Sequence, residues 1–431
     1  MAGDFFGAHT IMSATSELRK VSTGRDLYYT DGANSLAQSV PVEYNTRFRQ
    51  NFATLGAGQQ NMFIPPNAGV KHVVLVLGFD PANNALFAAQ NGSNALPRGW
   101  GYRALQSVSW RVAGSSQYFL SGSQLLARNL RMCKTQTQRN AILSLGGDEC
   151  KVAADFTSGP KYAYIPLSFW SAPSCDGLEV PIASDLLGQQ IQVSATIAGM
   201  DAIFTGVVAG WAGPAPQPLP TAFNVGYFQV EQLEMMDRAM SLASKADMDR
   251  ATYVQAIRSF DQQELVGQLA AQAGEQNITF SGFMSGEVRA IQVYLTDNTD
   301  PANSNVYIVP RDITLLYAGQ KFAEYKDGSS RIWNLIDGTS PSAAGASKLV
   351  ASGGVWTSVP VLTEYAILPF SQPIANDYEA DLLVSGKMIS NGSITLTLVS
   401  PDPTKAYTIH VVPVLNAAIA YSRGSATVLI G

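Results

Sequence analysis

An aromatic-rich strand, a corner and a second strand follow one another between residues 162 and 193, and this pattern restricts the fold more than any other part of the chain. Pro166 and Pro181 lie within it, and proline is tolerated in a sheet only at an edge or a bend. Residues 191–195 alternate between apolar and polar, which is the period of a half-buried strand. The pattern therefore predicts two strands joined at a sheet corner.

The length and charge content indicate two domains with largely covered surfaces. A chain of 431 residues suits two domains of about 200 residues each. Charged residues make up only 14% of the chain, whereas soluble domains usually carry about 25%. Such a surface is most simply covered by copies of the same chain. The net charge of -5 provides no basic surface for wrapping nucleic acid, so we expect no direct sequence-specific nucleic-acid binding.

Cysteine usage and the chain start predict reduced thiols and no leader. Cys133, Cys150 and Cys175 form neither a CxxC pair nor a disulfide framework, so we expect them to be reduced and buried. The N-terminus has an early acid, Asp4, and no long apolar run, so no secretory signal is expected. The most apolar stretch, residues 202–211, is about half as long as a membrane helix, so we expect no transmembrane segment.

The order of segments predicts two β units and a connector. Residues 1–58 are polar and mixed, and we interpret them as an N-terminal arm. Short strand-like runs fill residues 59–230 and residues 271–431, which we assign to two similar β domains. Residues 231–270 carry apolar side chains at helical spacing among charged ones, which predicts a helical connector.

Individual elements can be placed from the same periodicities. A helix is expected after Ser123, a plausible N-cap, because leucines and a methionine follow at helical spacing. We expect Trp110, Phe169 and Trp170 in the core of the first domain. Strands are expected at residues 61–66, 71–79, 101–112, 223–230, 277–280, 288–295, 312–320, 365–370, 393–399, 407–416 and 426–430.

An internal echo indicates two copies of one structural unit. Val-Ala-Gly around Ala113 and Tyr-Ala-Gly around Ala318 are each followed by Asn-Leu, beginning at Asn129 and Asn334, at the same distance along the chain. A second, looser echo relates residues 164–169 to residues 365–370.

Four places in the chain carry recognisable motifs. They are Tyr-Ile-Pro-Leu-Ser-Phe-Trp at 164–170 with Leu-Glu-Val-Pro-Ile-Ala at 178–183, the strand and charged segment at 225–238, the strands at 288–295 and 313–320, and residues 368–376 with the strands from His410 onward. In the same order, they resemble motifs of the double jelly-roll major capsid proteins of icosahedral double-stranded DNA viruses, the lineage of nucleocytoplasmic large DNA viruses and the adenovirus hexon. The resemblance spans about residues 60–431, and two departures indicate a divergent member: Asn376-Asp-Tyr-Glu replaces the family's Asn-Phe-Ser run, and the connector lacks an arginine-rich segment.

The resemblance implies an all-β fold of two consecutive eight-stranded jelly rolls with a short helical connector. It implies a structural major capsid protein, not an enzyme, whose homotrimers form pseudo-hexameric capsomers that tile an icosahedral virion. Its expected partners are itself, neighbouring capsomers, minor capsid and penton proteins, and an internal lipid membrane near the N-terminal arm. The expected location is the virion capsid, assembled in the cytoplasm of an infected cell.

No arrangement of reactive side chains stands out. His9, His72 and His410 have no metal spacing, and we expect the last two to be packed or edge residues of strands. We interpret the adjacent Asp148 and Glu149 as a turn, because neighbouring residues seldom face one site. Acidic loop positions could hold calcium, but they lack the order of an EF-hand. These are Asp297, Asp300 and Asp312. We therefore predict no catalytic, cofactor-binding or metal-binding residues.

Other functions remain open on this fold, since jelly rolls host several. The main alternative is a two-domain β-sandwich that binds carbohydrate or a receptor, such as a lectin or cupin-like module. A trimeric phage fibre or receptor-binding protein and a β-sandwich glycosidase are weaker alternatives. Three stretches match the glycosylation sequon, and we interpret them as turns because no secretory signal accompanies them. They begin at Asn91, Asn277 and Asn391.

Overall fold

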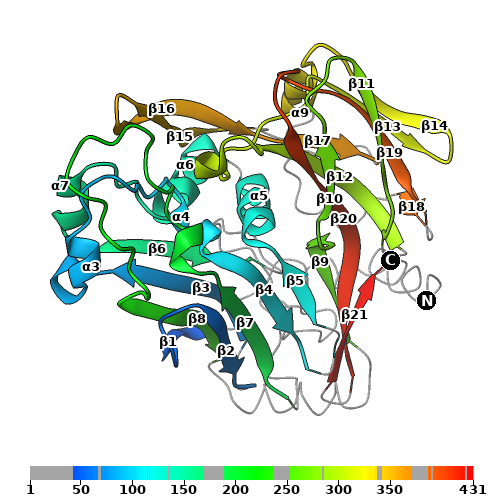
Figure 1. Cartoon of the computed structure of the whole chain (residues 1–431). Coiled ribbons are helices and arrows are strands. Elements are labelled where there is room, and N and C mark those ends of the chain that lie inside the picture. The colour runs from blue at the N-terminus through cyan, green and yellow to red at the C-terminus, as the bar shows by residue number, and fades with distance from the viewer. Residues whose placement is uncertain are drawn as a thin grey trace.

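The computed structural model shows an all-β chain with a few short helices (Figure 1). Phe169, Trp170, Cys175, Pro181 and Asn391 lie outside the residues that it describes. These described residues are 42–66, 69–113, 115, 117–133, 135–168, 189–235, 253–283, 286–336, 342–370, 387–389, 392–422 and 425–430.

The first roll consists of two four-stranded antiparallel sheets that share one core. Met62, Leu75 and Val193 are buried in this core, as is Trp110, which confirms its predicted position. The first sheet has the order β1 (Val42–Asn51), β8 (Val225–Met235), β3 (Gly69–Phe79), β6 (Lys161–Pro166), and the second has the order β2 (Gly58–Ile64), β7 (Ile191–Ile197), β4 (Leu105–Arg111), β5 (Tyr118–Leu120).

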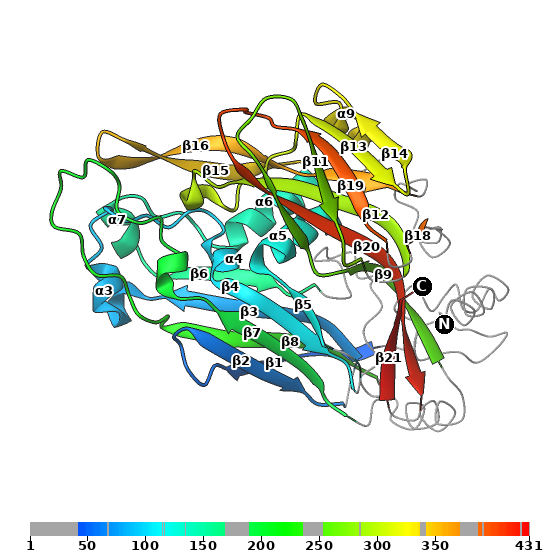
Figure 2. The same cartoon turned by 45° about the vertical axis from the view of Figure 1, so that its right-hand side comes forward.

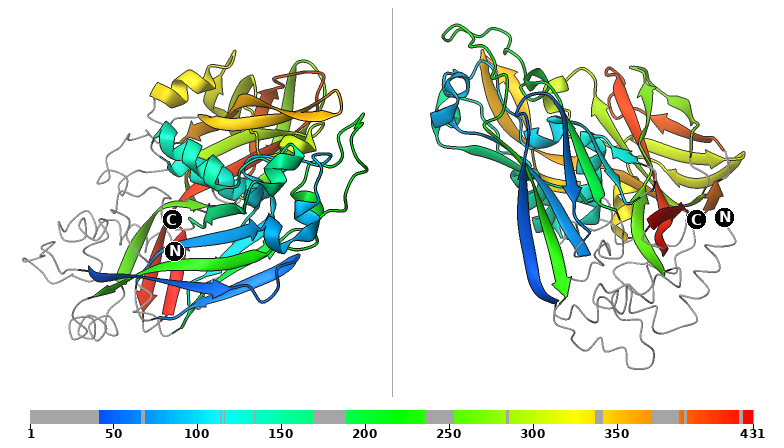
Figure 3. Two further views of the ribbon diagram at one scale, coloured as in Figure 1. Left: turned by 90° about the vertical axis from the view of Figure 1, so that its left-hand side faces the viewer. Right: turned by 90° about the horizontal axis from the view of Figure 1, so that it is seen from below.

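The second roll repeats this strand order, and the two rolls stand side by side when seen from below (Figure 3). One sheet has the order β10 (Leu265–Leu269), β20 (Tyr407–Ser422), β12 (Gly286–Asp297), β17 (Ala366–Pro369). Three more strands extend this sheet: β9 (Tyr253–Asp261) and β21 (Ser425–Ile430) pair with β20, and β18 (Lys387–Ile389) pairs with β12. The other sheet has the order β11 (Glu275–Phe280), β19 (Ile394–Val399), β13 (Asp312–Tyr317), β14 (Gln320–Tyr325). The fold is therefore a double jelly roll, as the sequence predicted.

Helices and a long hairpin fill the space between the rolls. Helix α5 (Gly122–Met132) lies between them in Figure 1. It begins where the Ser121 side chain accepts a hydrogen bond from the Gln124 amide, so Ser121, not the predicted Ser123, is the N-cap. A hairpin of β15 (Ser342–Ser352) and β16 (Val355–Glu364) extends from the second roll across the first (Figure 2). The other helices are α3 (Ala85–Ala88), α4 (Trp100–Arg103), α6 (Gln136–Leu145), α7 (Ala153–Thr157), α9 (Ser330–Ile336) and three 3₁₀ turns at Pro81–Asn83, Met200–Ala202 and Pro301–Asn303.

The prediction of a helix across residues 231–270 is wrong at both ends. Residues 231–235 continue β8, which pairs with β1, and the stretch 253–269 contains β9 and β10, which both pair with β20. A few apolar residues at helical spacing do not outweigh the ladder of hydrogen bonds that an open strand edge offers. The middle of the expected connector, residues 236–252, lies outside the described residues.

Two further predictions need correction. The expected N-terminal arm reached residue 58, but β1 pairs along its length with β8 and belongs to the first roll. The strand expected from residue 101 begins at Leu105, because residues 100–103 form α4. A side chain at Gly101 would lie 2.5 Å from the Cβ of Ala163, so this turn packs directly on β6. Among the described residues no helix is both long and apolar enough to cross a membrane.

The internal echo corresponds to one repeated tertiary contact. Asn129 on α5 donates its side-chain amide to the Pro166 carbonyl at 2.9 Å, and Asn334 on α9 donates to the Ile367 carbonyl at 2.7 Å. Ile367 returns a hydrogen bond from its backbone amide to the Asn334 side chain at 2.9 Å. Proline has no backbone N–H, so in the first roll the Ser168 hydroxyl donates to Asn129 instead. Each roll therefore uses a buried asparagine to hold a helix against its sheet.

Candidate functional site at the interface between the two rolls

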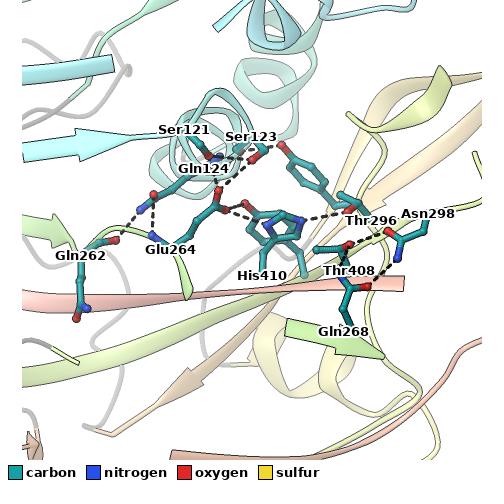
Figure 4. A network of polar contacts seen from close by, with 12 residues as sticks. Ser121, Ser123, Gln124, Gln262, Glu264, Gln268, Thr296, Asn298, Thr408 and His410 are labelled. Atoms are coloured by element: carbon teal, nitrogen blue, oxygen red, sulfur yellow. Dashed lines mark hydrogen bonds and ion pairs between the residues drawn. The ribbon is translucent and has the colours of Figure 1, made fainter. Parts of the chain in front are cut away.

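The Glu264 carboxylate joins the two rolls (Figure 4). It lies between β9 and β10 of the second roll and is 11% exposed. It accepts hydrogen bonds from the Ser121 hydroxyl at 2.6 Å and from the Tyr294 hydroxyl at 2.9 Å, and its other contact is His410 Nδ1 at 3.0 Å. Ser121 belongs to the first roll, whereas Tyr294 and His410 lie on β12 and β20. One carboxylate therefore fixes the start of α5 on the second roll.

The protonation state of Glu264 depends on this network. Burial raises the pKa of the carboxyl, but the hydrogen bond and charge of His410, together with the hydroxyls of Ser121 and Tyr294, lower it by more, so that the pKa lies below its ordinary value. The ring of His410 also stacks on Tyr294, with centroids 4.7 Å apart. His410 is therefore a packed strand residue, as predicted.

Gln124 continues the interface along α5 (Figure 4). Its side-chain amide donates to the Gln262 carbonyl at 2.6 Å, and its side-chain oxygen accepts the Glu264 backbone N–H at 3.0 Å. This fully buried amide thus satisfies both a donor and an acceptor of the β9–β10 connection. Left unpaired, such buried backbone groups would destabilise the fold.

A buried ion pair follows one turn further along α5. Arg128 Nη1 lies 2.8 Å from Asp261 Oδ1, and both side chains are only 1% exposed. Arg131 contacts the same carboxylate oxygen, and it also donates to the side chain of Gln292 on β12. Gln292 in turn donates to the Ala127 carbonyl at 3.2 Å. Asp261 and Gln292 of the second roll are therefore bonded to α5 of the first roll across the boundary between the rolls.

The same pair explains how a guanidinium is held in the interior. Burial lowers the pKa of Arg128, the Asp261 carboxylate raises it, and the net pKa is lowered. Arg128 also donates through Nε to the Ser168 carbonyl. An unpaired charge at this depth would be strongly destabilising.

The β15–β16 hairpin forms a second contact between the rolls. The Glu149 carboxylate accepts hydrogen bonds from Ser347 at 2.8 Å and from Ser358 at 2.9 Å, and it pairs with Lys151 at 2.9 Å. Burial raises the pKa of Glu149, but the Lys151, Ser347 and Ser358 contacts lower it by more. Trp356 adds a hydrogen bond to the Ser93 carbonyl at 3.1 Å. Glu149 therefore acts as an anchor for the hairpin.

The acidic loop positions singled out in the sequence are not brought together. No group of His, Cys, Asp and Glu that could hold a metal ion occurs within the described parts of the chain. Each loop acid has its own local partner. Asp297 pairs with Lys405 at 2.7 Å, Asp300 pairs with Lys348 at 2.6 Å, and Asp312 accepts the Asp327 amide at 2.9 Å.

The sequon positions differ in structure. Asn91 lies outside helices and strands, before a bend at residues 92–94, and its side-chain oxygen accepts the Ser93 amide at 3.0 Å. Its side-chain amide donates to the carbonyls of Pro214 and Ala215 at 3.1 and 2.8 Å. Asn277 lies in β11 instead of a turn, and its side chain accepts a hydrogen bond from Thr397 at 2.6 Å. Cys133 and Cys150 are buried, as predicted.

The interface residues were missed by the sequence analysis. Asp261 and Glu264 lie in the segment that was predicted to be a helical connector, and no partner was assigned to them. Their partners in the first roll lie more than 120 residues away along the chain. The available signal was the pair Arg128 and Arg131 on an otherwise leucine-rich helix in a chain with few charges.

The fold is similar to that of solved viral capsid proteins. The PBCV-1 virus capsid matches with a TM-score of 0.59 at 13% identity, covering 91% of this chain and 99% of that chain. The mavirus major capsid protein matches with a TM-score of 0.55 at 11% identity, covering 91% and 92%. The Faustovirus major capsid protein matches with a TM-score of 0.54 at 10% identity, covering 96% and 99%.

Sequence comparison adds nothing to this likeness. No protein-family model matches the chain, and no curated protein is similar to it in sequence. The likeness therefore extends over almost the whole of both chains while the amino acids have diverged. By its structure, the chain has the double jelly-roll fold of major capsid proteins.

Proposed function

We propose that this chain is a structural major capsid protein of an icosahedral double-stranded DNA virus. The observation that carries the proposal is the likeness in fold to capsid proteins of three viruses, which covers at least 90% of this chain and of each relative. The interface supports the same role, because a lattice unit needs two rolls held at a fixed angle. The buried Arg128–Asp261 pair and the Glu264 network provide such a constraint.

In this proposal three copies form a capsomer of near-sixfold outline, because each copy contributes two similar rolls. The homotrimer tiles the shell together with neighbouring capsomers, minor capsid proteins and penton proteins. The first roll occupies about residues 42–235 and the second about residues 253–430. Residues preceding β1 reach an internal lipid membrane or a neighbouring subunit. The role is non-enzymatic, and its location is the virion, assembled in the host cytoplasm.

The first experiment is the solution mass of the purified chain by light scattering. The proposal predicts a species of three times 46.0 kDa that resists dilution and salt, and lattice fragments in electron micrographs at high concentration. A stable monomer that binds a carbohydrate array would overturn the proposal in favour of a β-sandwich binding module. A trimer with elongated particles and no lattice would instead favour a fibre protein.

A further inference from the structure

The repeated asparagine contact aligns the two rolls residue by residue. Asn129 and Asn334 hold equivalent helices against equivalent strands, β6 and β17. Counting back from each asparagine, Ile332 and Trp333 on α9 correspond to Ala127 and Arg128 on α5. The two helices can therefore be compared position by position.

On α5 these two positions make the contact with the second roll. The Ala127 carbonyl accepts a hydrogen bond from Gln292, and Arg128 pairs with Asp261. Both α5 residues are buried, with no more than 1% exposed. The helix of the first roll therefore presents this face to a neighbouring roll.

On α9 the equivalent positions are apolar and open. Ile332 is 54% exposed and Trp333 is 50% exposed, although they are large hydrophobic side chains next to each other. Tryptophan is the residue most enriched among energetic hot spots of protein interfaces. The helix of the second roll therefore presents, at the same place, a face that fits an apolar partner.

The surface that would receive α9 can be identified from the same correspondence between the two rolls. In the second roll, Ile367, Gln292 and Val412 stand side by side on β17, β12 and β20, on the sheet face that α5 covers. In the first roll the corresponding row crosses β6, β3 and β8 and consists of Pro166, Val74 and Gln229. The outer face of the β1–β8–β3–β6 sheet is therefore equivalent to the face that receives α5.

Aromatic side chains gather on that outer face. The next row of the sheet places Tyr164, Val76 and Tyr227 side by side. Tyr164 is 40% exposed, and the rings of Tyr162 and Tyr164 lie 6.2 Å apart. A Cβ at Gly78 would lie 2.4 Å from the Tyr162 ring, so this tyrosine lies flat over the sheet. We call Tyr162, Tyr164 and Tyr227 the tyrosine face.

We propose that Ile332 and Trp333 of one copy dock on the tyrosine face of a second copy. The inference rests on the proposed capsid function and names the residues that join its subunits. In Figures 1 and 2, α9 lies at the top of the view and β6, β3 and β8 lie well below it, with α5 at a height between them, so one chain cannot satisfy both surfaces itself. The contact is head-to-tail, and such contacts close into a ring when the rotation between successive copies closes, which for three copies is a rotation of about 120°. Three chains then place six rolls in a ring in which every roll contacts the next through an equivalent helix and sheet face.

Single substitutions on either surface test the docking. Trp333→Glu and Tyr164→Glu should each weaken trimer association by at least about 30-fold, the minimum for loss of an interface hot spot, measured by sedimentation equilibrium. Both side chains are substantially exposed, so near-ultraviolet circular dichroism should show intact rolls. Val207→Glu is the matched control, because Val207 is 53% exposed but lies on neither surface, and it should leave the trimer unchanged.

Mixing the two variants tests the head-to-tail arrangement. The Tyr164→Glu chain keeps an intact α9 and the Trp333→Glu chain keeps an intact tyrosine face, so an equimolar mixture should form heterodimers of twice 46.0 kDa and no closed trimers. If the wild type is trimeric and both variants stay trimeric with unchanged dissociation constants, the docking proposal is wrong while the capsid proposal stands. A wild type that stays monomeric at all concentrations would overturn both.

Discussion

Substituting Asp261 by asparagine tests whether the interface between the rolls holds them as one unit. The substitution keeps the side-chain volume but removes the negative charge that faces Arg128 and Arg131. Because Arg128 is 1% exposed, its charge would be left buried without a counter-charge, and breaking such a pair costs about 3–5 kcal/mol. A domain of about 150–250 residues loses about 2–4 °C of melting temperature for each kcal/mol. We therefore expect the melting temperature to fall by about 10 °C.

The assay is differential scanning calorimetry at neutral pH on the wild type, Asp261→Asn and two comparison variants. Glu324→Gln removes an exposed carboxylate that pairs with Lys321, and it should leave the melting temperature unchanged. Arg128→Met and Arg131→Met combined with Asp261→Leu replace the whole charged cluster by apolar groups and should recover most of the loss, because no side chain of the cluster is then left without a counter-charge. A fall of less than about 2 °C for Asp261→Asn would refute the reasoning, because it would mean that Arg128 finds water or another partner at no cost.

Three further predictions concern the asparagine contacts, pH and thiol reactivity. Asn129→Leu and Asn334→Leu should each lower the free energy of unfolding by about 2–4 kcal/mol in urea titrations, since each leaves buried polar groups unpaired; a loss below about 1 kcal/mol in either would contradict the equivalence of the two contacts. The pKa of Glu264 is lowered in the folded protein, so its stabilisation is fully present above the ordinary value of 4.5 and is lost as pH falls through the lower folded value. Glu264→Gln should therefore be less stable than the wild type at pH 7, and the difference should shrink below pH 4.5; a difference that stays constant with pH would show that the charge contributes nothing. Burial raises the pKa of Cys150 to about 12, so its thiol should react with a maleimide at pH 7 only after unfolding, and rapid labelling of the native protein would place it at the surface.

Local patterns in the sequence were sufficient for most strands and for the duplication. The apolar run at residues 71–79 is β3, and the helix expected after Ser123 is α5, shifted by its true cap. The Asn-Leu echo predicted that Asn129 and Asn334 are equivalent. The prediction succeeded because each asparagine lies on the corresponding helix of its roll and donates to the corresponding strand. The spacing of apolar residues gave the wrong secondary structure at residues 231–270. A few apolar residues there have helical spacing, but pairing with distant strands makes the described parts of the segment β-strands.

The interface between the rolls could not be predicted because its partners are far apart in sequence. Asp261 and Arg128 are 133 residues apart along the chain, and no local spacing in the sequence indicates their contact. Charged residues usually face solvent, and the sequence analysis assigned Asp261 to a helical connector. The buried ones were the exception, and only the tertiary structure distinguishes them from the rest.

The equivalent helices α5 and α9 differ at the positions that face away from their own roll. Asn129 and Asn334 keep the same contact because each works inside its own roll, whereas Arg128 and its counterpart Trp333 face outward. Within one chain the two rolls are linked covalently, so their effective concentration is high. A desolvated ion pair can then set the angle between the rolls, although it contributes little net binding free energy. Between chains the contact must also overcome the loss of translational and rotational freedom, and large rigid aromatic side chains supply contact area with little loss of conformational entropy. Under the proposed docking, the arginine therefore suits the contact within one chain and the tryptophan suits the contact between chains.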